Sequence, residues 1–397
     1  MSEGWEIKKL GEVCIVERGS SPRPIEKFQT DSPDGVNWIK IGDTKGVDKY
    51  IFSTKEKITK EGAEKSRYVK EGDFILSNSM SFGNPYIMKT DGYIHDGWFV
   101  FRLPDYIDKD YFYFLLTSPN VQKQIQSLGA GAIVKNISGD LVKKVDVTYP
   151  KSLTEQKQIV SLLDEAFAGI GKAKENIERN LQNAKELFQS ELNSIFMNKG
   201  DGWVERKLGE VCEYDKTPNK RKDLPYIGLE NIESNTGKFI GSYEAQQVKS
   251  NTFYFSDKHV LYGRLRPYLN KALIPDFEGH CSTEIFPIKV NKELDRRFLF
   301  YWLISSNTVE KIDSTWTGAR MPRANMNLVI EFNFPMPPLP QQKQIVHQLD
   351  NLSRETKKLE SLYQQKLNGL EELKKSILEK AFRGELNYKK EIETIKD

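Results

Sequence analysis

The feature that most restricts the fold of this 397-residue chain is a tandem duplication. Residues 4–14 read GWEIKKLGEVC, and residues 202–212 read GWVERKLGEVC. A second motif, LTEQKQIV at positions 153–160, returns as LPQQKQIV at positions 339–346. The spacing between the copies is far longer than the period of a solenoid repeat. The sequence therefore predicts two copies of one globular domain, each followed by a segment that opens with the second motif.

Each globular part has the pattern of a mixed α/β domain. Short runs rich in β-branched and aromatic residues, bounded by Gly, Asp or Pro, predict strands. In the first copy the predicted strands are 36–41, 73–76 and 98–103, and one helix is expected across 111–116 and 121–128. In the second copy the predicted strands are 259–261 and 284–288, and a helix is expected at 298–304.

The segments behind the second motif have the pattern of long helices. Residues 159–196 contain no proline, and their apolar residues recur at steps of three and four, as on one face of a helix. Residues 345–382 repeat this register. Each segment predicts one helix of about 40 residues, about 60 Å long. Because neither helix can bury its apolar stripe alone, the two are expected to pair as a coiled coil.

The short connection at residues 198–202 sets the expected polarity of that pair. It starts the second domain where the first long helix ends, so the helices are expected to run antiparallel, with the domains at opposite ends. The predicted fold class is α+β: two similar mixed α/β domains separated by two long antiparallel helices that form a coiled coil, with an internal pseudo-two-fold repeat. The predicted limits are 1–152 for the first domain, 153–198 for the first helix, 199–338 for the second domain, 339–386 for the second helix and 387–397 for a polar C-terminal tail.

Composition excludes several classes of protein. No apolar run approaches the ~20 residues that cross a bilayer, and the N-terminus lacks the pattern of a secretory signal. Three cysteines are too few for a disulfide framework, four scattered histidines suggest no metal site, and no phosphate-binding loop is present. A cytoplasmic protein without a cofactor is expected. The net charge of +3 gives only a weak indication of nucleic acid.

Two short patterns suggest catalysis, but turns in loops explain them better. Asn84-Pro85-Tyr86 resembles the Asn/Asp-Pro-Pro-Tyr motif of amino-methyltransferases, but lacks one proline and follows no glycine-rich turn. The acids at Asp34 and Asp43 match a permissive metal-dependent nuclease pattern that has no equivalent in the second half. No catalytic residue is therefore predicted. Five residues in apolar surroundings are predicted to be core: Cys14, Cys212, Trp38, Trp98 and Trp302.

Several motifs occur in a characteristic order along almost the whole chain. Trp-x₃-Lys-Leu-Gly-Glu-Val opens each half, Leu-x₂-Gln-x₂-Ile-Val opens each long helix, and AFRGEL stands at 381–386. The second half also contains LYGRLRPY at 261–268, CSTE at 281–284 and GARMPR at 318–323. This set resembles the type I restriction–modification specificity (S) subunit, and the last three motifs look like one common type of target-recognition domain. The first half has SNSMSFGNPY at 77–86 instead, which implies that the two halves read different bases.

The resemblance implies a non-catalytic subunit that gives a complex its DNA sequence specificity. Each target-recognition domain reads one half of a bipartite, asymmetric site, and the helices set the spacer and dock the partners. The implied partners are double-stranded DNA, two methyltransferase (M) subunits and, in the cleaving complex, restriction (R) subunits, with no membrane. The alternative is a non-catalytic coiled-coil scaffold that binds proteins and makes no contact with DNA.

Candidate DNA-binding residues follow from the chemistry of readout. Arginine pairs with guanine, and asparagine or glutamine pairs with adenine, whereas Lys, Arg and Ser bind phosphates. The candidates in the first domain are Ser21, Arg23, Asn78, Ser79, Ser81, Asn84, Lys135 and Asn136. Those in the second domain are Lys216, Asn219, Arg221, Arg264, Arg266, Arg320 and Arg323. The four last-named arginines are expected to cluster in two glycine-containing loops.

Overall fold

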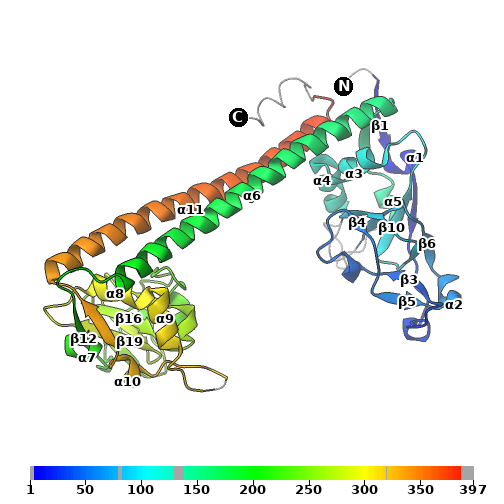
Figure 1. Cartoon of the computed structure of the whole chain (residues 1–397). Coiled ribbons are helices and arrows are strands. Elements are labelled where there is room, and N and C mark those ends of the chain that lie inside the picture. Colours follow the sequence, from blue (N-terminus) through cyan, green and yellow to red (C-terminus); the bar gives the residue numbers. More distant parts are fainter. Residues whose placement is uncertain (1–3, 79–82, 129–137, 319, 386–397) are drawn as a thin grey trace. The chain divides into compact units, whose positions relative to one another are not determined.

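The computed structural model describes residues 4–78, 83–128, 138–318 and 320–385 (Figure 1). The chain divides into two compact units. Unit 1 comprises Met1–Asn176 and Lys366–Asp397, and unit 2 comprises Ile177–Gln365. Within the described ranges, no helix combines the length and the apolar composition needed to span a membrane.

Unit 1 stacks a helical layer and two sheets. Its strands are β1 (Trp5–Lys9), β2 (Ile15–Arg18), β3 (Val36–Ile39), β4 (Tyr50–Ile51), β5 (Glu56–Ile58), β6 (Arg67–Val69), β7 (Phe74–Ser77), β8 (Pro85–Met88), β9 (Gly92–Ile94), β10 (Trp98–Arg102) and β11 (Asp146–Pro150). Its short helices are α1 (Leu10–Val13), α2 (Lys60–Ala63), α3 (Lys109–Thr117), α4 (Pro119–Leu128) and α5 (Gly139–Val142). The larger sheet has the order β2-β10-β7-β8-β4 and the smaller β5-β3-β9-β6, while β1 pairs with β11.

Alternation along the central strand of unit 1 explains this layering. Phe99 and Phe101 of β10 belong to the core shared with the helices. Trp98 and Val100, which point to the opposite face, belong to the core between the two sheets. All four side chains are fully buried because the sheet is covered on both faces.

Unit 2 repeats this architecture. Its strands are β12 (Val204–Lys207), β13 (Cys212–Tyr214), β14 (Tyr226–Ile227), β15 (Thr252–Phe255), β16 (His259–Gly263), β17 (Ala272–Leu273), β18 (Gly279–Ser282), β19 (Ile285–Val290) and β20 (Asn333–Met336). Its short helices are α7 (Leu208–Val211), α8 (Arg296–Ile304), α9 (Ser306–Asp313) and α10 (Met326–Val329). Its two sheets have the strand orders β13-β19-β16-β17 and β14-β18-β15. These orders match those of unit 1 without the edge strands β4 and β5. Strand β12 pairs with β20 as β1 does with β11.

Strand polarity also agrees between the two units. The smaller sheet contains one parallel pair in each, β3 with β9 and β14 with β18. On its other side β9 pairs antiparallel with β6 in unit 1, and β18 pairs antiparallel with β15 in unit 2. The predicted duplication and the α+β fold class are therefore confirmed.

The two long helices are continuous. They are α6 (Leu153–Met197) and α11 (Leu339–Ala381), drawn as two long coils in Figure 1. In unit 1 the first half of α6 lies beside the last part of α11, where Lys174 forms an ion pair with Glu371 at 3.3 Å. In unit 2 the last part of α6 lies beside the first half of α11, where Gln348 donates to Glu191 at 3.0 Å. Within each unit the helices therefore run antiparallel.

The helix ends complete the cores of the two domains. In unit 1, Ile377, Leu378 and Phe382 from the C-terminal end of α11 and just beyond it join the core of α3 and the larger sheet. In unit 2, Leu192 and Phe196 near the end of α6 join the core that contains α8. Each domain thus buries side chains from the long helix that begins in the other half of the sequence.

A buried glutamine ties the start of each long helix to its own domain. Gln156 of α6 has no exposed surface; its Nε2 donates to Pro150 O at 2.9 Å and Tyr106 O at 3.1 Å, and its Oε1 accepts from Asp108 N at 2.7 Å.

Gln342 of α11 makes the same three bonds in unit 2. It donates to Pro337 O at 2.8 Å and Glu293 O at 2.9 Å, and accepts from Asp295 N at 2.8 Å. Each glutamine satisfies three backbone groups: two just before α3 or α8 and one just before its own helix.

Most elements expected from the sequence are present, with one difference. Strands β3, β7, β10, β16 and β19 and helix α8 lie where periodicity predicted them. The single helix expected across 111–128 is wrong, because the chain forms α3 and α4 with Ser118 extended between them. Pro119 explains the break, since proline cannot continue a helix but suits the first position of the next one.

Candidate nucleic-acid interface

In unit 1, three of the predicted residues contact Asp96, which lies in the turn between β9 and β10. The Ser21 hydroxyl donates to Asp96 Oδ1 at 2.8 Å, and Arg23 pairs with Asp96 Oδ2 at 3.1 Å. Asn78 Nδ2 donates to the backbone carbonyl of Asp96 at 2.8 Å. Burial raises the pKa of Asp96, but hydrogen bonds from Ser21 and the backbone outweigh it, so the net pKa is lowered and the carboxylate stays ionised.

A cavity of about 540 Å³ opens beside this cluster. Ser21 and Arg23 line it together with Trp38 and His95. Burial lowers the pKa of His95, so this imidazole is neutral near neutral pH. The cavity thus combines an aromatic wall with polar groups held by Asp96.

The other candidates of unit 1 do not join this cluster within the described residues. Asn84 is exposed, just before β8. The remaining four, Ser79, Ser81, Lys135 and Asn136, lie outside the described residues.

In unit 2, the corresponding cluster forms around Glu284. Arg264 Nε donates to Glu284 Oε2 at 2.9 Å, and Arg323 Nε and Nη2 both lie 2.9 Å from Glu284 Oε1. The two loops are also joined by their backbones, because Ala324 N donates to Arg264 O at 2.8 Å. The expected clustering of these two arginines is therefore present, with an acid between them.

A third basic residue reaches the same place. Lys216 Nζ lies 5.0 Å from the ring centroid of Phe286, and the guanidinium carbon of Arg264 lies 5.5 Å from it. Cations over an aromatic ring are stabilised by its quadrupole. Arg266 and Arg320 belong to the same two loops and are exposed.

Two candidates of unit 2 lie elsewhere. The Arg221 side chain pairs with Asp223 and Glu278, and these hydrogen bonds raise its pKa. Asn219 folds back onto Arg221, with Nδ2 donating to Arg221 O at 2.8 Å. Together they line a smaller cavity of about 250 Å³ that also reaches His280.

The two acids at the centres of these clusters were not predicted. Asp96 and Glu284 both occupy the turn between corresponding strands, β9–β10 and β18–β19. Each meets the loop after β7 or β16, where Asn78 and Arg264 lie. Glu284 was visible as the last residue of CSTE, but selection by residue type favoured cations and amides. The sequence signal that could have identified both residues was an acid in a short turn before a buried strand.

The residues of the two catalytic patterns have structural partners. Asp43 accepts from the backbone N–H groups of Lys40 at 2.8 Å and Lys55 at 3.1 Å. Tyr86 is buried and its ring meets that of Trp98 edge-on. The contacts of Asp43 support the interpretation of its pattern as a turn. For Asn84-Pro85-Tyr86 the expected turn is wrong in part, because Pro85 and Tyr86 begin the buried strand β8.

The predicted core residues are buried. Trp38, Trp98 and Trp302 are at most 4 % exposed, which confirms their assignment. Cys14 and Cys212 donate to Leu10 O and Leu208 O at 3.4 Å, and burial raises the pKa of each thiol to about 12. Neither thiol is therefore a nucleophile near neutral pH.

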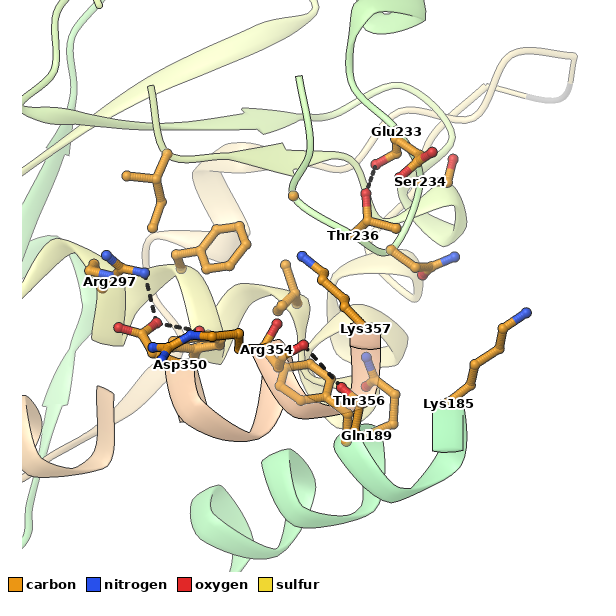
Figure 2. A pocket seen from close by; sticks show the side chains of 18 of the residues that line it. Lys185, Gln189, Glu233, Ser234, Thr236, Arg297, Asp350, Arg354, Thr356 and Lys357 are labelled. Carbon is orange, nitrogen blue, oxygen red and sulfur yellow. Dashed lines mark hydrogen bonds and ion pairs between the residues drawn. The ribbon is translucent and has the colours of Figure 1, made fainter. Parts of the chain in front are cut away.

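Unit 2 also contains a large groove, of about 1020 Å³, between α8, the loop before residue 238 and the long helices. Its apolar lining includes Phe188, Phe300 and Ile304. Figure 2 shows Lys185 of α6 and Arg354 and Lys357 of α11 on its helical side, with the loop of Glu233, Ser234 and Thr236 on the opposite side. Asp350 does not add free charge, since it accepts from Arg297 at 2.7 Å and the Tyr301 hydroxyl at 2.6 Å.

Comparison with known proteins gives consistent results. A family model for the type I restriction modification DNA specificity domain matches residues 2–179 and again residues 200–371. The chain is 28% identical over 321 residues to the type I restriction enzyme EcoDI specificity subunit of Escherichia coli, covering 71% of each chain. It is 19% identical over 370 residues to the MjaIX specificity subunit of Methanocaldococcus jannaschii, covering 85% of this chain and 84% of that relative.

Two solved structures share the fold. A chain from a structure that describes complex assembly and conformational transition of the type I restriction–modification system superposes with a TM-score of 0.78, at 18% identity, covering 97% of this chain and 99% of that one. The HsdS subunit from Thermoanaerobacter tengcongensis superposes with a TM-score of 0.61, at 20% identity, covering 97% and 98%. With two copies of the family domain across most of its length, the chain belongs to the type I restriction–modification DNA specificity subunits, a non-catalytic component of these systems.

Proposed function

We propose that the chain reads a split DNA site, one half with the Asp96 cluster of unit 1 and the other half with the Glu284 cluster of unit 2. The observation that carries this proposal is that both clusters stand on corresponding loops but present different donors. Unit 1 presents the hydroxyl of Ser21 and the guanidinium of Arg23, while the buried amide of Asn78 holds its loop. Unit 2 presents Arg266, Arg320 and Lys216 instead. Different donors recognise different base edges, so the two half-sites differ in sequence.

The partners in this proposal are double-stranded DNA, two methyltransferase subunits and, for cleavage, restriction subunits. The long helices set the spacing between the half-sites. The residues proposed to contact DNA directly or to hold the loops that do are Ser21, Arg23, Asn78, Ser79, Ser81, Asn84, Lys135, Asn136, Lys216, Asn219, Arg221, Arg264, Arg266, Arg320 and Arg323.

Asp96→Asn is expected to change recognition of the first half-site only. The amide keeps the shape of the side chain but removes the charge that holds Ser21 and Arg23, so discrimination in that half should fall about tenfold or more. The measurement is a map of methylated adenines in DNA exposed to the full chain assembled with its methyltransferase subunits. Asp31→Asn, an exposed acid of the same unit, is the control.

Two outcomes would count against the assignment. A change in both half-sites contradicts one reader per unit, and binding that does not weaken as salt rises favours the protein scaffold without DNA contact. The same map gives the spacer, which an insertion of about one helical turn in both α6 and α11 is expected to change.

We also propose that the groove of unit 2 receives an acidic amphipathic helix of a methyltransferase subunit. Part of its lining is apolar, and Lys185, Arg354 and Lys357 form no ion pair within the described residues. Apolar grooves with a charged wall suit one face of a helix. The repeat offers a natural comparison, because Phe167 of α6 aligns with Ser353 of α11 when the two helices are matched at their opening motifs. In unit 1 this phenylalanine fills the corresponding place, packing on Phe114 at 5.6 Å.

Ser353→Phe is expected to fill the groove and weaken association with the methyltransferase subunit by about tenfold or more, equivalent to about 1.4 kcal/mol. The fold should tolerate the change because Phe167 already occupies the corresponding position. Sedimentation or calorimetry of the full chain with the methyltransferase subunit measures the effect. Lys358→Phe, on α11 but outside the groove lining, is the control, and equal affinity for both variants would reject the groove as a docking surface.

A further inference from the structure

The four arginines of the two loops that meet at Glu284 are not equivalent. Arg264 and Arg323 share the Glu284 carboxylate, with each contact at 2.9 Å. Arg266 and Arg320 are exposed, and neither donates its guanidinium to an acceptor within the described residues. Arg264 and Arg323 therefore join the two loops through Glu284, and Arg266 and Arg320 remain available to a ligand.

Arg266 is held by an unusual backbone. It adopts the left-handed conformation, with φ 52° and ψ 65°, although it precedes Pro267, where extended backbone is preferred. Its N–H donates to Pro322 O at 2.7 Å, and its carbonyl accepts from Leu269 N at 2.9 Å. A non-glycine residue in this region is strained and persists only when its surroundings fix it. Glycine would suit the backbone better, so the guanidinium must serve another purpose.

The surroundings favour a base edge over a phosphate. Tyr268, in the same turn, is 53% exposed, and Met321, which adjoins Pro322, is 48% exposed. Trp316, beside the strand-like pairing of Thr317 with Arg323, is 51% exposed. Apolar side chains contact bases and thymine methyl groups rather than phosphate oxygens. A guanidinium whose backbone is fixed in a loop that carries these side chains is suited to bidentate pairing with guanine O6 and N7.

We propose that Arg266 reads a guanine in the half-site of unit 2, and that Glu284 is the positioning residue that fixes its loop against the loop of Arg323. This inference rests on the proposed function, because it assigns one base to one residue of the unit 2 reader.

The test is Arg266→Gly in the full chain assembled with its methyltransferase subunits. Glycine accepts the left-handed backbone without strain, so the melting temperature should stay equal or rise. Selection of bound duplexes from a randomised library should show discrimination lost at one G·C pair of the second half-site, by about 10-fold to 100-fold, with the other positions kept. Arg206→Ala, an exposed arginine of β12 that pairs with Glu293, removes the same charge as a control.

The outcomes separate this inference from the proposed function. A uniform loss of affinity for all duplexes, with a shallower salt dependence, would identify a phosphate contact and overturn the guanine assignment. Wild-type chain that selects no sequence at all would instead refute the proposed function. For Glu284, Glu284→Gln should lose the same G·C preference, Glu284→Asp should restore part of it, and adding Glu284→Gln to Arg266→Gly should cause no further loss at that pair. Loss spread over all positions would reduce Glu284 to a structural role.

Discussion

Phe382→Ala is expected to destabilise the domain of unit 1 by about 3 kcal/mol, although Phe382 stands close to the far end of the sequence. The ring is 6% exposed and meets Tyr111 of α3 at 5.2 Å between centroids. Truncating a buried phenylalanine leaves a cavity that the surrounding helices fill only partly. Hydrogen exchange measured by mass spectrometry should show faster exchange in α3 and β10.

The duplication supplies a matched comparison for this variant. Phe196 is the counterpart of Phe382 when the long segments are aligned at their opening motifs, and it packs against Phe298 of α8 at 5.3 Å in unit 2. Phe196→Ala should therefore accelerate exchange in α8 and leave α3 unchanged. If Phe382→Ala leaves the protection of α3 as it is in the wild type, the end of α11 does not contribute to the core of that domain.

Gln342→Leu is expected to cause a large loss of stability in unit 2. Leucine has a similar volume but cannot replace the three hydrogen bonds that Gln342 makes with Asp295 N, Glu293 O and Pro337 O. Because each backbone group left buried without a partner costs about 1–3 kcal/mol, the free energy of unfolding should fall by about 3 kcal/mol or more. Denaturant unfolding, followed by the fluorescence of the tryptophans, measures the change.

The control for this substitution is Gln344→Leu, on the exposed side of the same helix. It should alter the free energy of unfolding by less than about 0.5 kcal/mol. Gln156→Leu should reproduce the loss in unit 1, where the same three bonds exist. If Gln342→Leu and Gln344→Leu have similar free energies of unfolding, water or neighbouring groups must replace the hydrogen bonds that Gln342 makes.

The sequence was sufficient for the elements that depend on local periodicity. The long helices are visible because apolar residues recur every three or four positions without a proline, and β10 is visible as a short aromatic run. The repeated Leu-x₂-Gln-x₂-Ile-Val motif predicted where each helix opens. It did not reveal what Gln156 and Gln342 do, because their partners include backbone groups that are distant along the chain, such as the carbonyls of Tyr106 and Glu293.

The clusters were harder to predict for the same reason. Residue type directed attention to Arg264 and Arg323, but the acid that they share, Glu284, meets them only through tertiary pairing of β16, β19 and the loop after α9. The separation of Arg221 from Arg264 likewise depends on Glu278 and Asp223, which hold it elsewhere. Which arginines remain free for a ligand is therefore decided by acids that a search for DNA-binding residues passes over.

The exchange of helix ends between the halves of the sequence has a consequence for how the chain folds as it is synthesised. Phe382 leaves the ribosome long after its partner Tyr111, whereas Phe196 leaves it before its partner Phe298. The N-terminal domain of a nascent chain usually folds first. Here the side chains that α6 contributes to the second domain are made before that domain's own strands, whereas the core of the first domain stays incomplete until Phe382 has been translated. The domain that is made first is thus the one whose core closes last.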